Sequence, residues 1–142
     1  MRDNRRKLVW VISLFVGLLF VFGCLADNLE QLPIRSLTLT IDPQQREELF
    51  DQLHRFGDKH GFEFTLTDYG TNGKRFLVEL LRKDINVLAV DIPDTSNMVS
   101  IRFYNHSFTN PVDEKTIETV DELFTELQSR LGEIPNVTIT EE

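Results

Sequence analysis

The sequence predicts an α+β domain of two layers, with two helices packed on one face of a mostly antiparallel sheet. Apolar and polar residues alternate in about six short stretches, which is the pattern of half-buried strands. Two longer stretches repeat apolar residues at helical spacing, and each has a single apolar stripe. A helix with one apolar stripe packs against one neighbouring layer, so both helices are expected on the same side of the sheet.

An uncharged stretch of nineteen residues, Leu8–Ala26, follows a basic head formed by Arg2, Arg5, Arg6 and Lys7. A helix needs about 20 apolar residues to cross the hydrocarbon core of a bilayer, with a lower limit near 17. A secretory signal peptide needs a basic start, an apolar centre of about 7–15 residues and small residues at its end. The stretch fits both descriptions, so a signal peptide and an uncleaved signal-anchor transmembrane helix are both open.

The end of this stretch resembles the lipidation signal of bacterial lipoprotein precursors. Those precursors carry an aliphatic residue, a tolerant position, a small residue and then the cysteine that is lipidated. Val21, Gly23 and Cys24 match the first, third and fourth places. Phe22 fills the second place and is bulkier than its usual occupant. The resemblance implies a cleaved signal peptide and acyl chains, such as palmitate, on Cys24; the alternative is a signal-anchor helix in which Cys24 is an ordinary apolar residue.

The charges on either side of the stretch predict its orientation. Four basic residues precede it, and Asp27 and Glu30 follow it before any lysine or arginine. The positive-inside bias therefore keeps the N-terminus in the cytoplasm and exports the rest of the chain. We divide the sequence into a signal peptide or signal-anchor helix (1–23), a polar tether (24–33) and one α+β domain (34–142), anchored outside the cytoplasm on the cell membrane or outer membrane.

Composition separates the two parts of the chain. The first 23 residues hold four of the 15 basic and one of the 23 acidic residues, so residues 24–142 carry 11 basic and 22 acidic residues, a net charge of −11. Such an acidic domain repels nucleic acid and anionic lipid headgroups. Cys24 is the only cysteine. The exported domain is therefore expected to have no disulfide and to be stabilised by packing alone.

The first half of the domain predicts a strand, a helix and a strand. Ile34–Ile41 alternates as a strand does, and Asp42-Pro43 is typical of a helix N-cap and first helical position. The helix is expected to continue to about His60, with Gly61 as its C-cap. Phe62–Thr67 alternates again, with its apolar side chains pointing inward.

The second half predicts three further strands, a second helix and a short last strand. Turn-forming residues separate the strands. Asn110-Pro111 is expected to open the second helix, and Gly132 and Pro135 to end it. The strands are expected at Lys74–Arg82, Val87–Ile92, Met98–Tyr104 and Val137–Thr140.

The predicted order is strand, helix, four strands, helix, strand. It resembles a ferredoxin-like two-layer sandwich with an enlarged central meander. This arrangement occurs with many unrelated functions, so it implies no particular activity.

Two polar groups invite a functional interpretation. Asp51, His54 and Asp58 stand at i, i+3 and i+7 on the first helix, so they can share a face for acid–base chemistry or metal binding. Ion pairing with nearby basic residues explains them equally well. The loop Asp91–Asn97 gathers oxygen ligands of the kind that calcium prefers, although its spacing differs from the EF-hand loop. From neither group do we assign a catalytic residue, a metal ligand or a cofactor.

The meander predicts an apolar patch on the sheet face away from the helices. If Phe76, Val78 and Leu80 face the helices, the alternate residues of that strand face away. Threonines of the outer strands are expected to make the sides of this face polar. An apolar patch ringed by polar groups often marks a partner site. The predicted partner-binding residues are Leu77, Leu81, Val87, Ala89 and Tyr104.

No motif in the sequence identifies a biochemical activity. We expect a membrane-anchored, extracytoplasmic protein of the bacterial envelope, and we favour a non-enzymatic role. Its domain is expected to bind a protein partner or itself through the open sheet face, and not nucleic acid. The alternatives are a small-ligand or cation-binding module that uses the acidic surface or the Asp91–Asn97 loop, and a hydrolase-type enzyme centred on Asp51, His54 and Asp58.

Overall fold

The computed structural model describes residues 32–69, 75–106 and 112–142. The predicted membrane segment and Cys24 lie outside the described residues. The helices and strands are β1 (Arg35–Thr40), η1 (Pro43–Gln45), α2 (Arg46–His60), β2 (Glu63–Tyr69), β3 (Arg75–Leu81), β4 (Ile85–Asp91), β5 (Met98–Asn105), α3 (Glu114–Leu131) and β6 (Thr138–Glu141).

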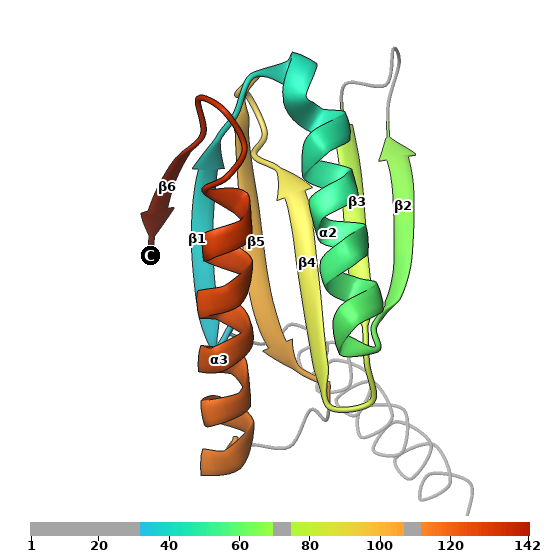
Figure 1. The fold of residues 1–142 in the computed structure, drawn as a ribbon, viewed down its shortest axis with the longest axis vertical. Helices are drawn as coiled ribbons and strands as arrows, with labels where there is room; N and C mark the ends of the chain where they lie inside the picture. The colour runs from blue at the N-terminus through green and yellow to red at the C-terminus, as the bar shows by residue number, and fades with distance from the viewer. Residues whose placement is uncertain (1–31, 70–74, 107–111) are drawn as a thin grey trace, which may run out of the picture. The chain divides into compact units, whose positions relative to one another are not determined.

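The strands form one six-stranded sheet in the order β2-β3-β4-β5-β1-β6. Every neighbouring pair is antiparallel. The two long helices, α2 and α3, both lie in front of the sheet in Figure 1. The α+β class, the antiparallel six-stranded sheet and the two helices are therefore confirmed. We call the sheet face that packs against α2 and α3 the closed face, and the opposite one the open face.

The first helical segment begins and ends where the sequence predicts. The Asp42 carboxylate accepts a hydrogen bond from Gln44 N–H at 2.9 Å, and Pro43 starts the single 3-10 turn that leads into α2. At the other end Gly61 takes a φ of 70°, a left-handed conformation that glycine adopts without the steric cost of a Cβ. Asp42 is therefore confirmed as the cap of this 3-10 turn and Gly61 as the C-cap of α2, whereas α2 itself begins at Arg46 after Gln45.

The second helix begins later than predicted. Asp113 is its N-cap, and the Asp113 carboxylate accepts from the backbone N–H of Thr116 at 2.8 Å and from its hydroxyl at 3.0 Å. These bonds satisfy donors of the first turn, so the helix starts at Glu114. The prediction that Asn110-Pro111 opens the helix is therefore wrong, and those two residues lie outside the described residues.

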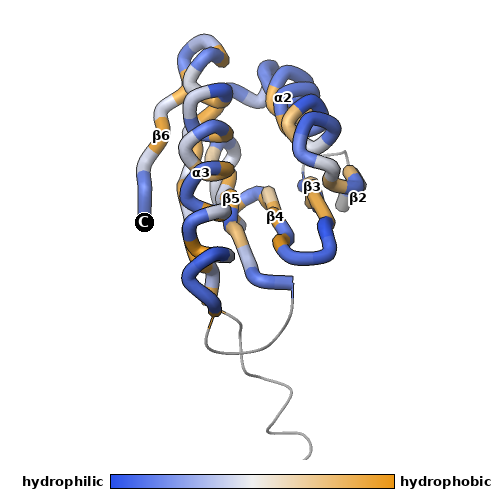
Figure 2. Tube along the Cα trace, turned by 60° about the horizontal axis from the view of Figure 1, so that its bottom comes forward, coloured by the Kyte–Doolittle hydropathy of each residue, from blue (hydrophilic) through white to orange (hydrophobic). Residues whose placement is uncertain are grey.

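The core lies between the closed face and the helices. Phe103 of the sheet meets Phe124 of α3 edge-on, with ring centroids 5.7 Å apart. Gly57 lets α2 approach the sheet closely, because a Cβ there would lie 3.1 Å from Leu80 Cδ2. Hydrophilic and hydrophobic residues alternate along α3 in Figure 2, as expected of a helix with one buried stripe. The helix residues in the core are Leu49, Leu53, Phe56, Val120, Leu123, Phe124, Leu127 and Leu131.

Candidate interaction surface

Apolar side chains meet near the centre of the open face. Leu77 lies opposite Val90, and Leu81 lies opposite Asn86, which in turn lies opposite Tyr104. Residues directly opposite each other in an antiparallel pair point to the same face of the sheet. Half-buried apolar side chains therefore form one group, which we call the open-face patch: Leu77, Leu81, Leu88, Val90 and Tyr104.

Polar groups surround and interrupt this patch. Leu88 lies between Glu79 on β3 and Arg102 on β5. The Arg102 side chain folds back along its own strand, where its Nε donates to Ser100 Oγ at 3.0 Å. The registers also place on this face the threonines predicted for its sides: Thr38, Thr40, Thr65 and Thr67. The described part of the chain has no helix on the open face (Figure 1), so the patch is an accessible surface framed by charges and hydroxyl groups.

The structure confirms part of the predicted patch and corrects the rest. Leu77, Leu81 and Tyr104 lie on the open face, although binding of a partner by them stays a prediction. The placement of Val87 and Ala89 on that face is wrong. Both side chains are only 1% exposed and belong to the hydrophobic core. Their places on the open face are taken by the neighbouring residues, Leu88 and Val90.

The turn between β3 and β4 explains this correction. Arg82 N–H donates to Ile85 O at 3.1 Å, so only Lys83 and Asp84 lie between the last paired residues of the hairpin, and β4 begins two residues earlier than predicted. The Arg82 side chain holds the turn in place. Its Nε donates to Asp84 Oδ1 at 2.6 Å, and its guanidinium lies 4.7 Å above the centroid of the Phe62 ring. This short turn sets the register that places Val87 opposite Leu80 on the closed face.

The most buried carboxylate of the Asp91–Asn97 loop is hydrogen-bonded to other residues of the protein. Asp91 is only 7% exposed. Its Oδ1 accepts from Arg46 Nη2 at 2.8 Å, and its Oδ2 accepts from Phe76 N–H at 2.8 Å. Burial raises the pKa of Asp91, opposed by the hydrogen bond from Phe76 and by the charge of Arg46. Asp91 therefore ties α2 to the end of β3 and does not present two open oxygens to a cation.

A pocket of about 520 Å³ lies beside this ion pair. Both Arg46 and Arg75 reach it, so it has positive as well as negative groups in its wall. The loop turns sharply there, since Asp94 has a φ of 64°. Side-chain oxygens of the kind that calcium prefers are carried by Asp91, Asp94, Ser96 and Asn97, and the first three of these residues line the pocket. Asn97, the fourth member, instead accepts a hydrogen bond from Ile41 N–H through its backbone oxygen, at 2.8 Å.

The side chains of Asp51, His54 and Asp58 on the first helix do not meet at a common site. Asp51 pairs with Arg55 at 2.6 Å, one turn along the helix. His54 Nε2 is 3.8 Å from Asp58 Oδ1, and both side chains are mostly exposed. The His54 ring packs instead beside Phe64 of β2, with centroids 4.8 Å apart. The three residues form separate surface contacts, so they do not assemble an acid–base site.

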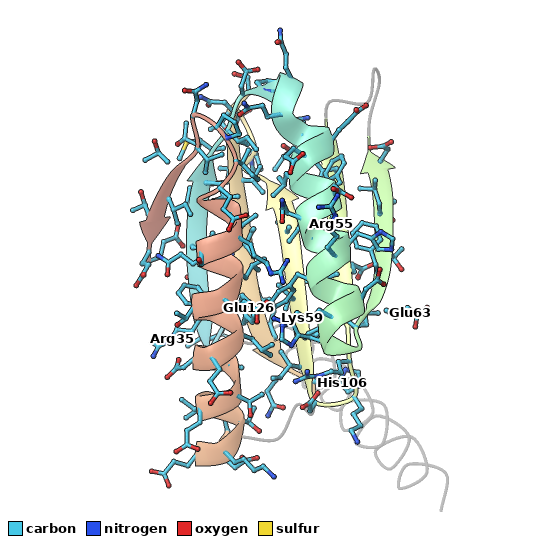
Figure 3. The ribbon with its side chains drawn as sticks, viewed as in Figure 1. Arg35, Arg55, Lys59, Glu63, His106 and Glu126 are labelled. Atoms are coloured by element: carbon cyan, nitrogen blue, oxygen red, sulfur yellow. The ribbon has the colours of Figure 1, made fainter. Side chains whose placement is uncertain are left out.

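A cluster of charges that sequence reasoning missed joins the two helices. Glu126 of α3 accepts from Lys59 Nζ at 2.9 Å, and Figure 3 labels both residues. Glu126 also accepts from Arg130 Nε at 2.8 Å and lies 3.0 Å from His60 Nε2. The hydrogen bond from Lys59, with those from Arg130 and His60, lowers the pKa of Glu126 to about 2 against the opposing effect of desolvation. Its α2 partners stand more than sixty residues away in the sequence, so no local pattern predicts the cluster.

No family model matches the chain, and no curated protein sequence matches it. Within residues 32–69, 75–106 and 112–142, no group of three or more side chains is placed to hold a metal ion. No helix in the same ranges is both long and apolar enough to cross a bilayer.

Proposed function

We propose that this protein is a membrane-anchored interaction domain that binds a protein partner through the open-face patch. The observation that carries the proposal is the position of that patch, which is apolar at its centre, polar at its sides and accessible among the described residues. Patches of this kind on soluble domains often mark sites for protein partners. Tyr104 adds an aromatic ring with a hydroxyl group, a side chain that is common at the centres of protein interfaces.

The size of the patch indicates a weak contact. Its aliphatic side chains are already half-buried, so completing the burial of each would contribute roughly 1 kcal/mol. Association costs several kcal/mol in lost translational and rotational freedom. Anchoring both partners to one membrane would raise their effective concentration and offset part of that cost. The membrane anchor and the weak patch are therefore consistent with each other in this proposal.

The anchor is proposed from the sequence of residues 1–31. The uncharged stretch behind a basic head supports export of the domain, and the resemblance at Val21, Gly23 and Cys24 supports lipidation. We expect that Cys24→Ala abolishes labelling by a fatty-acid probe and leaves the longer precursor intact. Absence of label on the wild-type chain would contradict lipidation and favour a signal-anchor helix.

We also propose that the domain is a ferredoxin-like sandwich enlarged by one hairpin. The strand order supports this, because removing β3 and β4 from it leaves β2-β5-β1-β6, with α2 following β1 and α3 following β5. An experimental structure whose β1-α2-β2 and β5-α3-β6 units superpose on a ferredoxin-like core would support the proposal. Units that do not superpose would contradict it.

Photo-crosslinking in intact cells tests the binding role. A photoreactive amino acid placed at Leu88, on the open face, is expected to give a discrete crosslinked product. The same amino acid at Glu122, an exposed position on α3, is the matched control and should give none. Equal yields of the same product from both positions, or no product from Leu88, would contradict a role for the open face.

The small-ligand alternative has one observation in its favour, the pocket beside Arg46 and Arg75. A ligand held there would raise the melting temperature of the wild-type protein. Replacing Arg75 with Ala would remove that shift, because Arg75 is an exposed residue of the pocket wall. A screen of small carboxylates and phosphates without any wild-type shift would leave this alternative without support.

A further inference from the structure

Among the described residues, one end of the sheet presents a strand edge that pairs with no other strand. β2 is the terminal strand, and β3 pairs with all seven of its residues on the other side. An edge strand directs every second backbone N–H and C=O away from the sheet. These groups can pair with an extended segment of another chain, a common way in which proteins recognise peptides.

The register shows which residues of β2 direct their backbone outward. The bond from Arg82 N–H to Ile85 O makes these two a hydrogen-bonded pair, and such pairs alternate along an antiparallel ladder. On β3, Leu80, Val78 and Phe76 therefore turn toward β4. The residues between them turn toward their partners on β2, which are Glu63, Thr65, Thr67 and Tyr69. The backbone groups of Phe64, Leu66 and Asp68 consequently point away from the sheet.

The side chains of these outward-pairing residues lie on the α2 side of the edge. Leu66 lies opposite Val78, a core residue, yet it is 40% exposed. Among the described residues it is the most exposed large apolar side chain of the sheet. Phe64, one step along, packs beside His54 of α2. From Phe64 to Thr67 the edge thus carries no charge, and its side chains on the α2 side, Phe64 and Leu66, are apolar.

Natural edge strands are commonly protected by charged side chains, most often lysine, by proline, by a bulge or by short length. β2 has seven residues and contains neither lysine nor proline. The opposite edge strand, β6, has four residues, and its Glu141 accepts a hydrogen bond from Gln128 of α3. β2 is therefore the edge that is suited to accept another strand.

Acidic side chains flank this edge. The contact between His54 and Phe64 shows which stripe of α2 faces β2. At helical spacing that stripe also includes Glu47, Asp51 and Asp58. Arg55 offsets Asp51, and the nearest partner of Asp58 is His54 at 3.8 Å.

The strand itself adds acids and no basic residue. β2 carries Glu63 at its start and Asp68 near its end, both of them exposed, and it contains no lysine or arginine. Counting the acids of α2 with these, the flank of the edge is net negative. A second copy of this chain would bring the same acids against each other, whereas a basic segment would find complementary charge.

We propose that the free edge of β2 binds an extended, basic segment of a partner protein as an added strand. The segment pairs with the backbone of Phe64, Leu66 and Asp68. Its apolar side chains lie beside Leu66, and its basic side chains lie near the acids at the two ends of the edge. This site is separate from the open-face patch, so it does not rest on the function proposed above.

A designed peptide tests the proposal with the full-length chain in non-ionic detergent. The probe is a fluorescein-labelled peptide of sequence KTVTVTK, which as a strand presents lysine and valine on one face and threonine on the other. The matched control is ETVTVTE. Fluorescence anisotropy is expected to show saturable binding of the lysine peptide, at least tenfold tighter than that of the glutamate peptide and weakened by salt. Equal binding of the two peptides, or none of either, would overturn the proposal.

Two changes to the backbone locate the peptide. Leu66→Pro removes an N–H that points away from the sheet, so no bond to β3 is lost, and at least tenfold weaker binding is expected. Methylating the backbone nitrogens of the probe that would pair with β2 should weaken binding in the same way. This test leaves the protein unchanged, so it remains valid if Leu66→Pro fails to fold. Leu88→Ser, on the open face, should leave peptide binding unchanged.

Two further measurements test the acidic side chains beside the edge and the oligomeric state of the protein. Asp58→Asn combined with Asp68→Asn is expected to weaken binding and to reduce its dependence on salt. Unchanged affinity in Leu66→Pro, or with the methylated probe, would contradict strand addition at this edge. A wild-type dimer that Leu66→Pro dissociates would identify a second copy of the chain, and not a basic partner, as the occupant.

Discussion

The two faces of the sheet use the same strands for different purposes. On the closed face Leu80 is fully buried against α2, where Gly57 allows the helix to approach. On the open face Leu88, from the adjacent strand, is half-buried and lies between Glu79 and Arg102. The residue type is the same, but one side chain is held by a packed layer and the other by polar neighbours. Position in the fold therefore decides whether a leucine contributes to stability or to a surface.

Charged groups differ in the same way. Asp91 is on the closed face, buried beside Arg46, and burial raises its pKa. Glu126 is at the surface between the two helices, and the hydrogen bond from Lys59 and its other basic partners lower its pKa to about 2. The two carboxylates should consequently respond to acid in opposite directions, and this is measurable.

The largest effect is expected from Leu80→Ala. Removing a fully buried leucine leaves a cavity and should lower the free energy of unfolding by about 3–4 kcal/mol. Leu88→Ala is the matched control on the open face and should cost less than about 1 kcal/mol. Urea denaturation of a fragment covering residues 27–142 measures both. Similar losses of unfolding free energy in the two variants would contradict the idea that the closed face contributes more to stability than the open face.

Arg46→Met is expected to cost about 3 kcal/mol, because it leaves the Asp91 carboxylate buried without its guanidinium partner. A carboxyl group whose folded pKa is raised contributes stability below its unfolded pKa and loses that contribution as the pH rises through the folded value. Mild acid should therefore restore part of the stability that this variant loses. Thermal unfolding at a series of pH values checks this, and a loss that is the same at every pH would contradict it.

Glu126→Gln is expected to lower the free energy of unfolding by about 1 kcal/mol at neutral pH, since its ion pairs are partly exposed. A carboxyl group with a lowered folded pKa contributes stability above its unfolded pKa, and this is lost as the pH falls through the folded value. As the pH falls from 4.5, the ordinary pKa of a glutamate, to about 2, the wild-type protein should therefore lose more stability than the variant. Denaturation measured at a series of pH values checks this. If wild type and variant lose the same stability across that pH range, the cluster does not stabilise the helix pair.

The smallest effect on stability is expected from Leu88→Ser, about 0.5 kcal/mol or less for a half-buried surface position. Its effect on partner capture should be larger, because it places a polar group at the centre of the open-face patch. Crosslinking from a neighbouring open-face position in intact cells measures that capture. If the variant captures its partner as well as wild type does, the open-face patch is not needed for binding.

Local signals predicted much of the fold. Asp42 and Gly61 act at the helix ends where they were expected, because a cap is formed by residues only a few positions apart. The start of α3 was missed because two candidate caps stand close together in the sequence, and the helix uses Asp113, whose carboxylate accepts from Thr116 N–H. The strands of the open face were predicted with the correct phase on β3, where polar Glu79 marks the exposed side.

The residue pattern alone was enough to predict the kind of each element, the acidity of the domain and the absence of a cysteine from it. The phase of β4, the partners of Glu126 and the exposure of the β2 edge depend on how the elements pack together. Residues 85–90 of β4 are apolar in both phases apart from one asparagine, so alternation could not say which side chains are buried. The two-residue turn held by Arg82 made that choice. Arg82 is held at this turn by the Phe62 ring and by His60 O, which accepts from Arg82 Nη1 at 3.1 Å, and Glu126 pairs with Lys59 and His60. These partners lie twenty or more residues away along the chain, and no local pattern contains them.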